Sequence, residues 1–105
     1  EEDYQLILKK CQECRENTIV ISHGTDRMIQ TAQLLGQHIH NKTIVLFGAM
    51  RPYVMKESDA SFNMGGALIA AQSLPYGVYI VMNGTVFEWD NVRKNRELGI
   101  FEPLK

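Results

Sequence analysis

The chain has 105 residues, of which 45% are hydrophobic and 22% are charged, and its formal net charge at pH 7 is −1. This composition is typical of one small globular domain over residues 1–105. The near-zero charge argues against a nucleic acid or an anionic membrane as partner. No apolar run approaches the roughly 20 residues of a membrane span, and the acidic residues 1–3 are unlike the basic start of a signal peptide.

Two cysteines, Cys11 and Cys14, have the C-x-x-C spacing of redox and zinc sites. Zinc needs two further ligands, but there is no second such pair, and His38 and His40 are poorly spaced to share a helical face. A redox pair would open a helix just after a strand, whereas this pair lies near the end of a helical pattern. We therefore expect two reduced thiols near a buried helix face, no metal, and a cytoplasmic protein.

Three segments show the apolar spacing of amphipathic helices. They cover residues 4–17, residues 27–39, and a third stretch that begins at 59 or 60 and ends at 73. The third segment is rich in small residues, which let a helix approach a sheet closely, although glycine weakens a helix.

Residues 18–22, 43–47 and 77–82 are near-continuous apolar runs, which are typical of strands covered on both faces. Residues 85–89 are expected to add a short extended piece, and the tail 90–105 is expected to be charged and irregular. The alternation of helices and strands predicts an α/β fold. We expect a three-layer sandwich around a mostly parallel sheet, of the flavodoxin-like or Rossmann-like kind.

Parallel strands bring their carboxyl ends to one edge of a sheet, where α/β proteins bind ligands. The segments 22–26, 48–52 and 83–84 follow the three strands, so we expect them side by side at that edge. The first segment contains a hydroxyl, Thr25, next to a carboxylate, Asp26. Its turn is therefore the first place to look for an active site.

Each polar residue near this edge also has an ordinary structural explanation. Thr25 or Asp26 can cap the second helix, and Asp59 can cap the third. His23 has the setting of a packed histidine, and Lys94 that of a solvated lysine in a charged tail. Taken together, however, a hydroxyl, a carboxylate and a lysine can activate a nucleophilic hydroxyl or a water, provided that the lysine is deprotonated.

Two further groups of the turn fit such chemistry. Asp26 can hold an ammonium group of a substrate. The backbone N–H groups of Gly24 and Thr25, close to the start of a helix, can stabilise an oxyanion.

Five segments in order match motifs of one family. They are VISHGTDRM at 20–28, VLFGAMRP at 45–52, SDASFN at 58–63, GVYIVMN at 77–83 and NVRK at 91–94. These segments resemble the hGTDTM, TGAMRP, SDGPxN, GVxVVMN and DVTK segments of the bacterial-type (class 1) L-asparaginase/glutaminase family. The match covers most of the chain, and the order and spacing of the segments make it specific.

The resemblance implies hydrolysis of asparagine to aspartate and ammonia through an acyl-enzyme, with no cofactor and no metal. It implies that Thr25, Lys94 and Asp26 form a catalytic triad, and that Asp26 also binds the α-amino group of the substrate. Gly24 corresponds to a glycine of the substrate pocket, and Ala49 to the residue whose backbone faces the leaving amide. Substrate binding is thus expected at Gly24, Thr25, Asp26 and Ala49, in a homo-oligomer that takes a small amino acid.

The sequence also departs from the family pattern. The family's N-terminal TGGTI motif, which supplies the principal nucleophile, has no counterpart here, and neither do its substrate-carboxylate segment and its C-terminal domain. We therefore expect an incomplete asparaginase N-terminal-like domain that lacks its first strand and is inactive alone. In the last motif Arg93 stands beside Lys94, where it either influences the lysine or merely adds surface charge.

Two other functions stay open. The chain can be a non-catalytic amino-acid-binding or assembly domain with a degenerate site. A subunit of a tRNA-dependent amidotransferase is a weaker alternative, because the near-neutral charge gives no footprint for RNA.

Overall fold

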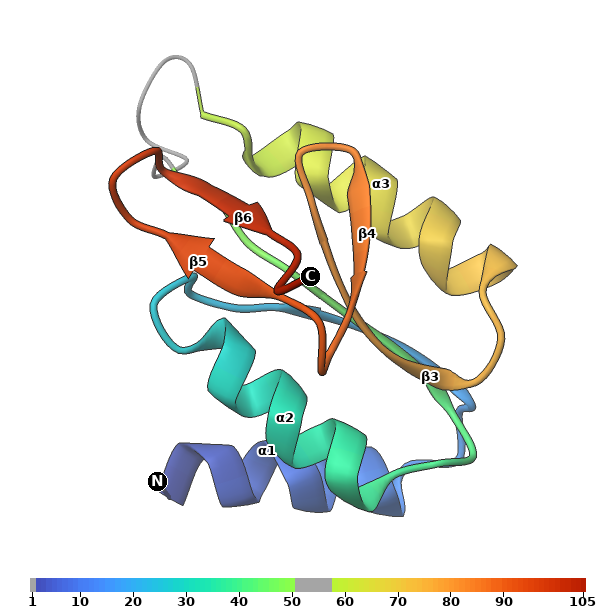
Figure 1. Ribbon diagram of the computed structural model, residues 1–105. Coiled ribbons are helices and arrows are strands. Elements are labelled where there is room, and N and C mark those ends of the chain that lie inside the picture. Colours follow the sequence, from blue (N-terminus) through green and yellow to red (C-terminus); the bar gives the residue numbers. More distant parts are fainter. Residues whose placement is uncertain (1, 51–57) are drawn as a thin grey trace.

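The computed structural model describes residues 2–50 and 58–105, in which helices and strands alternate (Figure 1). The helices are α1 (Glu2–Glu13), α2 (Met28–His38) and α3 (Ala60–Ser73), and the strands are β1 (Thr18–Ser22), β2 (Thr43–Phe47), β3 (Gly77–Met82), β4 (Thr85–Glu88), β5 (Arg93–Asn95) and β6 (Ile100–Glu102). The predicted helices are present, and the first three strands have the predicted bounds. Residues 51–57, which include the end of the predicted segment 48–52, lie outside the described residues.

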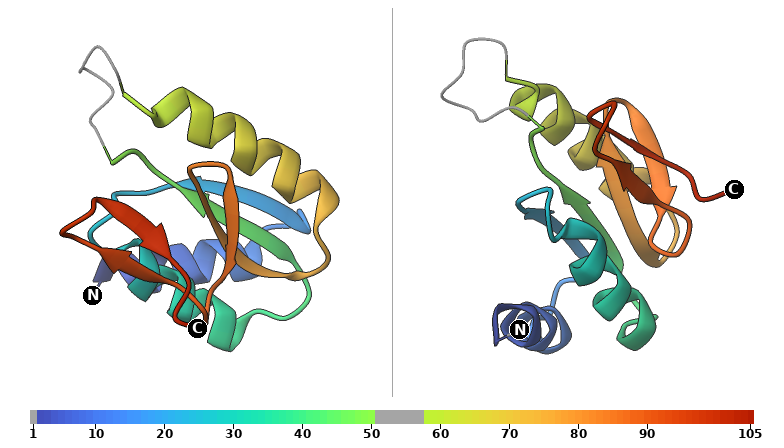
Figure 2. Two further views of the ribbon diagram at one scale, coloured as in Figure 1. Left: turned by 45° about the horizontal axis from the view of Figure 1, so that its top comes forward. Right: turned by 60° about the vertical axis from the view of Figure 1, so that its left-hand side comes forward.

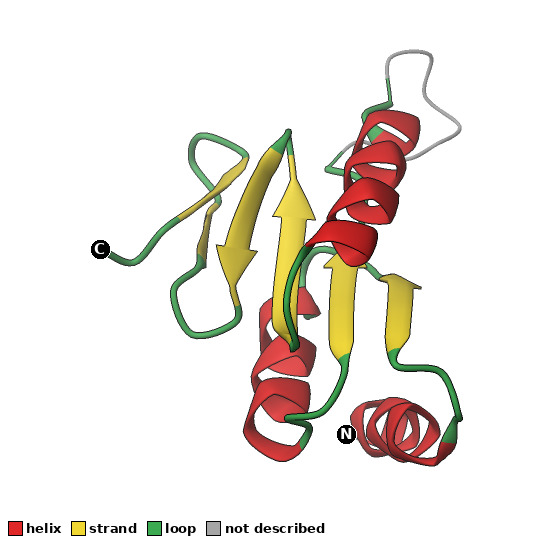
Figure 3. Ribbon diagram, turned by 90° about the vertical axis from the view of Figure 1, so that its right-hand side faces the viewer, coloured by secondary structure: helices red, strands yellow, loops and turns green. Residues whose placement is uncertain are grey.

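The main sheet has the order β1-β2-β3-β4. Its first three strands are parallel neighbours, and β4 returns antiparallel to β3. The expectation of a mostly parallel sheet is confirmed, and the loops after β1, β2 and β3 leave the sheet at one edge, as Figure 3 shows. Among the described residues β1 pairs only with β2, and the additional strand expected in the sheet stays a prediction.

Both faces of the sheet are buried, because alternate side chains of β2 and β3 enter two separate hydrophobic clusters. Ile44 and Ile80 belong to the cluster formed with α1 and α2, whereas Val45 and Val81 pack with the alanines of α3. Figures 2 and 3 show α3 on one face of the sheet and α1 and α2 on the other. This confirms the three-layer α/β sandwich and explains the unbroken apolar runs.

The prediction of an irregular tail was wrong. Residues 93–95 and 100–102 pair as the antiparallel hairpin β5–β6. Phe101 anchors it in the core beside α2, and Gly99, with a φ of 68°, lies in its turn. Three-residue strands as polar as Arg-Lys-Asn carry no alternation signal, so the pairing depends on tertiary contacts. The hairpin matters because β5 carries Lys94.

The connection between β4 and β5 crosses α2 at a glycine. A Cβ atom added to Gly36 would lie 2.3 Å from the ring of Trp89, so only glycine lets the indole lie this close to the helix. Trp89 thereby packs against the same core cluster that holds Phe101. The hairpin is thus fixed to the domain from two directions.

A buried lysine donates hydrogen bonds to backbone carbonyls at the C-terminal end of α1. The Nζ of Lys42, whose residue is 5% exposed, donates to the carbonyl oxygens of Cys11 at 2.6 Å and Cys14 at 2.7 Å and lies 3.3 Å from the Cys14 Sγ. Carbonyls at a helix C-terminus lack intrahelical donors and favour a cation. Cys11 of α1 belongs to the hydrophobic core, as expected, and burial raises the pKa of its thiol.

Replacing Lys42 by methionine should lower the free energy of unfolding by about 1–3 kcal/mol, because two carbonyls lose their donor while the apolar stem is kept. Urea denaturation measures the change. Lys9→Met, on the exposed side of the same helix, is the control and should change stability by less than about 0.5 kcal/mol. Equal stability of the two variants would show that the Lys42 contacts do not hold α1.

No helix among the described residues is long and apolar enough to cross a lipid bilayer.

Candidate active site

The turn after β1 is fixed by the backbone and by a histidine. The N–H of His23 donates to the carbonyl of Phe47 at 2.8 Å, which extends the β1–β2 ladder by one bond. The His23 ring lies 2.8 Å from the Gly24 carbonyl through Nδ1 and 2.9 Å from the Thr31 hydroxyl through Nε2. Since a carbonyl only accepts, Nδ1 donates to it, and Nε2 is hydrogen-bonded to the Thr31 hydroxyl. His23 therefore ties the turn to α2, as its structural explanation predicted.

The hairpin brings Lys94 to the end of β1. Its Nζ donates to Thr25 Oγ1 at 2.9 Å and to Asp26 Oδ1 at 2.7 Å. The Lys94 side chain is 11% exposed, whereas that of Asp26 is 75% exposed. The alternative role of Thr25 or Asp26 as a helix cap is wrong, because the residue before α2 is Arg27 and no side chain caps that helix.

This arrangement can move a proton between two heteroatoms. A deprotonated Lys94 at 2.9 Å is within reach of the proton on Thr25 Oγ1. The hydroxyl oxygen would then become nucleophilic, or would activate a water in the same way. Asp26 at 2.7 Å would stabilise the ammonium that Lys94 becomes. The three side chains of the expected triad are thus in hydrogen-bond contact, while their catalytic roles stay predictions.

The Asp26 carboxylate also pairs with a second cationic side chain. The Nη1 of Arg96 donates to the same Oδ1 atom at 3.0 Å. The hydrogen bonds from Lys94 and then from Arg96 hold the pKa of Asp26 below its usual range. A depressed carboxyl pKa favours the folded state at pH above about 4, the unfolded value, and this contribution disappears as the pH falls through the lower folded pKa.

The pKa of Asp26 should rise towards its usual value in Lys94→Met, and by less in Arg96→Met, because the Lys94 hydrogen bond is the larger cause. Titration of the carboxyl carbon by NMR between pH 2 and about 6 covers the range. An Asp26 pKa that is the same in the parent and in Lys94→Met would contradict the described contact.

The end of β2 lies against the Thr25 turn. A Cβ atom added to Gly48 would lie 2.2 Å from the His23 carbonyl oxygen and 3.3 Å from Thr25 Cγ2, so only glycine fits between the two strand ends. Ala49 follows and is half-buried, and Gly24 is exposed. Both lie at the ends of neighbouring strands, as expected, and their contacts with a substrate stay predictions.

Sequence reasoning missed the side chain that joins these loops. Asn63 of α3 is fully buried. Its Nδ2 donates to the Gly48 carbonyl and to Asp59 Oδ2, both at 2.9 Å, and its Oδ1 accepts from the Asn83 N–H at 2.8 Å. Asp59 precedes α3 as predicted, but its carboxylate accepts from the Met50 N–H at 3.1 Å and does not cap the helix. The sequence signal that could have identified Asn63 is an amide side chain in the first turn of a helix that has no charged residue and is largely apolar.

The two arginines of the hairpin differ in direction. Arg93 pairs with Glu102 across β5–β6. Neighbouring residues of a strand point to opposite sides, so the Arg93 side chain points away from that of Lys94. The interpretation of Arg93 as surface charge is therefore the better one. Arg96, in the turn that follows β5, is the arginine that reaches Asp26, and sequence reasoning did not single it out.

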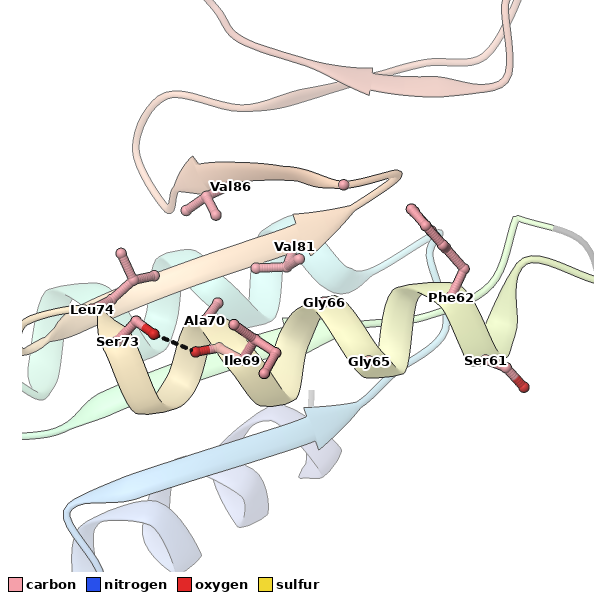
Figure 4. A pocket seen from close by; sticks show the side chains of 11 residues that line it. Ser61, Phe62, Gly65, Gly66, Ile69, Ala70, Ser73, Leu74, Val81 and Val86 are labelled. Carbon is pink, nitrogen blue, oxygen red and sulfur yellow. Dashed lines mark hydrogen bonds between the residues drawn. The ribbon is translucent and has the colours of Figure 1, made fainter.

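A hollow on α3 lies apart from this chemistry (Figure 4). It is formed by α3 and the β3–β4 pair and includes Phe62, Ile69, Val81 and Val86, with no charged side chain in its lining. The Ser73 hydroxyl donates to the Ile69 carbonyl of the same helix at 2.8 Å. Within residues 2–50 and 58–105, no three acidic, histidine or cysteine side chains are grouped to hold a metal ion.

Comparison with known proteins assigns the chain to a family. The family model described as "Asparaginase, N-terminal" matches residues 1–100. This chain belongs to the asparaginase family. L-asparaginase 2 of Escherichia coli (strain K12) is 40% identical over 79 residues, which are 71% of this chain and 23% of that protein. One subunit of the glutamyl-tRNA(Gln) amidotransferase of Methanococcus vannielii is 42% identical over 69 residues, which are 65% of this chain and 16% of that protein.

A solved structure gives the same assignment for the fold. The thermostable L-asparaginase from Thermococcus kodakarensis superposes with a TM-score of 0.88 at 30% identity, over 97% of this chain and 33% of that chain. The asparaginase-family fold of this chain is therefore established. The chain spans between 16% and 33% of the length of these relatives, so their activities apply to it only as proposals.

Proposed function

We propose that this chain carries part of the active site of an asparaginase-type amidohydrolase. The substrate is L-asparagine or a related carboxamide, and the products are the acid and ammonia. The observation that supports this proposal is the contact of Lys94 Nζ with Thr25 Oγ1 at 2.9 Å and Asp26 Oδ1 at 2.7 Å, in a chain of the asparaginase family.

Five residues have parts in the proposed reaction, namely Gly24, Thr25, Asp26, Ala49 and Lys94. Lys94 takes the proton of Thr25 Oγ1, either directly for attack by that oxygen or to activate a water. Asp26 holds the resulting ammonium and binds the α-amino group of an amino-acid substrate. The N–H groups of Gly24 and Thr25 face the oxyanion, and the Ala49 backbone faces the leaving amide. Hydrolysis of one carboxamide consumes one water and yields one carboxylic acid and one ammonia.

The relatives named above are longer than these 105 residues. The chain covers a third or less of each relative named above, and the family's principal nucleophile has no counterpart in it. We propose that the 105 residues alone are inactive. A homo-oligomeric state and a cytoplasmic location are part of the same proposal.

The first test is turnover by the longest encoded form that contains this chain. Ammonia release is measured with L-asparagine and with L-glutamine, and calorimetry measures binding of L-aspartate and L-asparagine. Turnover of either amide supports the amidohydrolase. Binding without turnover would instead favour a non-catalytic amino-acid-binding domain.

The likeness to an amidotransferase subunit favours a second candidate, a subunit of a tRNA-dependent amidotransferase. Such a protein would hydrolyse glutamine faster when its partner and the tRNA are present. If neither the partner nor the tRNA accelerates glutamine hydrolysis, this second candidate is excluded.

A further inference from the structure

One oxygen of Asp26 receives both cations. Lys94 Nζ lies 2.7 Å and Arg96 Nη1 lies 3.0 Å from the same Oδ1 atom. The two differ in burial, since the Lys94 side chain is 11% exposed and the Arg96 side chain is 67% exposed. Lys94 therefore approaches Asp26 from inside the domain, and Arg96 lies on the side open to solvent.

The position of Arg96 conflicts with an ammonium on the substrate. Under the proposed function, which this inference assumes, Asp26 binds the α-ammonium of L-asparagine. That ammonium would join two cations already on the carboxylate, and it must displace Arg96 or bear its repulsion. A ligand without an α-ammonium carries no such penalty.

We propose that Arg96 determines specificity by occupying the α-ammonium position on Asp26. The site then prefers carboxamides that bear a carboxylate but no α-ammonium, of which succinamate is the simplest relative of asparagine. Placing a like charge against the substrate is a common way to reject a ligand. L-Asparagine is the poorer substrate of the two.

The hairpin offers a matched control for this role. Arg93 lies at the start of β5, is 61% exposed and is also paired with a carboxylate, but its partner is Glu102. The ladder of β5–β6 and the buried Phe101 hold the hairpin through contacts that involve neither arginine side chain, so we expect both variants to fold. Arg93→Ala removes the same charge from the same hairpin without freeing Asp26.

The experiment compares the parent, Arg96→Ala and Arg93→Ala in the longest encoded form. Calorimetry gives the dissociation constants of succinate and L-aspartate, and ammonia release gives kcat/KM for succinamate and L-asparagine. The parent should prefer the ligand without the ammonium, in binding and in turnover. Arg96→Ala should lower this preference about fivefold, the size expected for one like charge about 4 Å away in water, and Arg93→Ala should leave it unchanged.

The outcomes separate the inference from the proposed function. A preference unchanged in Arg96→Ala, or a parent that prefers L-aspartate, overturns the role of Arg96 even if ammonia is released. A shifted binding preference with no ammonia from either amide keeps the role of Arg96 and overturns the amidohydrolase. Absence of both binding and turnover overturns both.

Discussion

Replacement of Lys94 by methionine should reduce ammonia release by the longest encoded form about 10²- to 10⁴-fold, the usual contribution of a positioned general base. The substitution keeps the length of the stem and removes the nitrogen that donates to Thr25 Oγ1 at 2.9 Å. Asp26 retains Arg96 as a partner, so the loss should fall on kcat more than on the stability of the turn.

The control for this variant is Lys105→Met, which removes an exposed lysine beyond the same hairpin. Both variants should keep the parent circular dichroism spectrum. Activity of Lys94→Met within about threefold of the Lys105→Met control, far short of the effect of a general base, would remove Lys94 from the proposed triad.

The Asn63→Asp substitution should lower the free energy of unfolding by about 3 kcal/mol or more, because it puts a carboxylate where a fully buried amide donates two hydrogen bonds. The new oxygen would face the Gly48 carbonyl and the Asp59 carboxylate, which both accept only. The acceptor for the Asn83 N–H would be kept. The strand ends that carry the candidate site should therefore loosen first.

Chemical denaturation measures this effect, and hydrogen exchange at the Gly48 and Asn83 amides locates it. Gln72→Glu adds the same charge to the same helix at an exposed position, and it should change stability by less than about 0.5 kcal/mol. If Asn63→Asp is as stable as Gln72→Glu, Asn63 does not clamp the ends of β2 and β3.

The main sheet was predictable because its strands are covered on both faces. Val45 faces α3 while Ile44 faces α1 and α2, so neither strand face had to be polar and the apolar runs mark the strands by themselves. The hairpin β5–β6 was not predictable, since each strand has only three residues and β5 is entirely polar. Its position follows from Phe101 and Trp89, whose contacts are distant in sequence.

The candidate site was predictable in part for the same reason. Thr25 and Asp26 follow from the rule that ligands meet the carboxyl ends of parallel strands. Lys94 was grouped with Thr25 and Asp26 from its residue type, but its specific role came from the resemblance to the asparaginase family, because a lysine in a charged tail is usually solvated. Asn63 and Arg96 were missed, since their partners at Gly48 and Asp26 lie 15 and 70 residues away in the chain.

The central claim is that Thr25, held by Lys94, takes part in hydrolysis of a carboxamide. Its most direct test is ammonia release from L-asparagine and succinamate by the longest encoded form, compared with Thr25→Ala and with Thr18→Ala, which alters an exposed threonine at the other end of β1. We predict that the parent and Thr18→Ala release ammonia and the corresponding acid in equal amounts, and that Thr25→Ala is slower by about 10²-fold or more. Equal rates for Thr25→Ala and the parent, or no release by a folded parent, would contradict it.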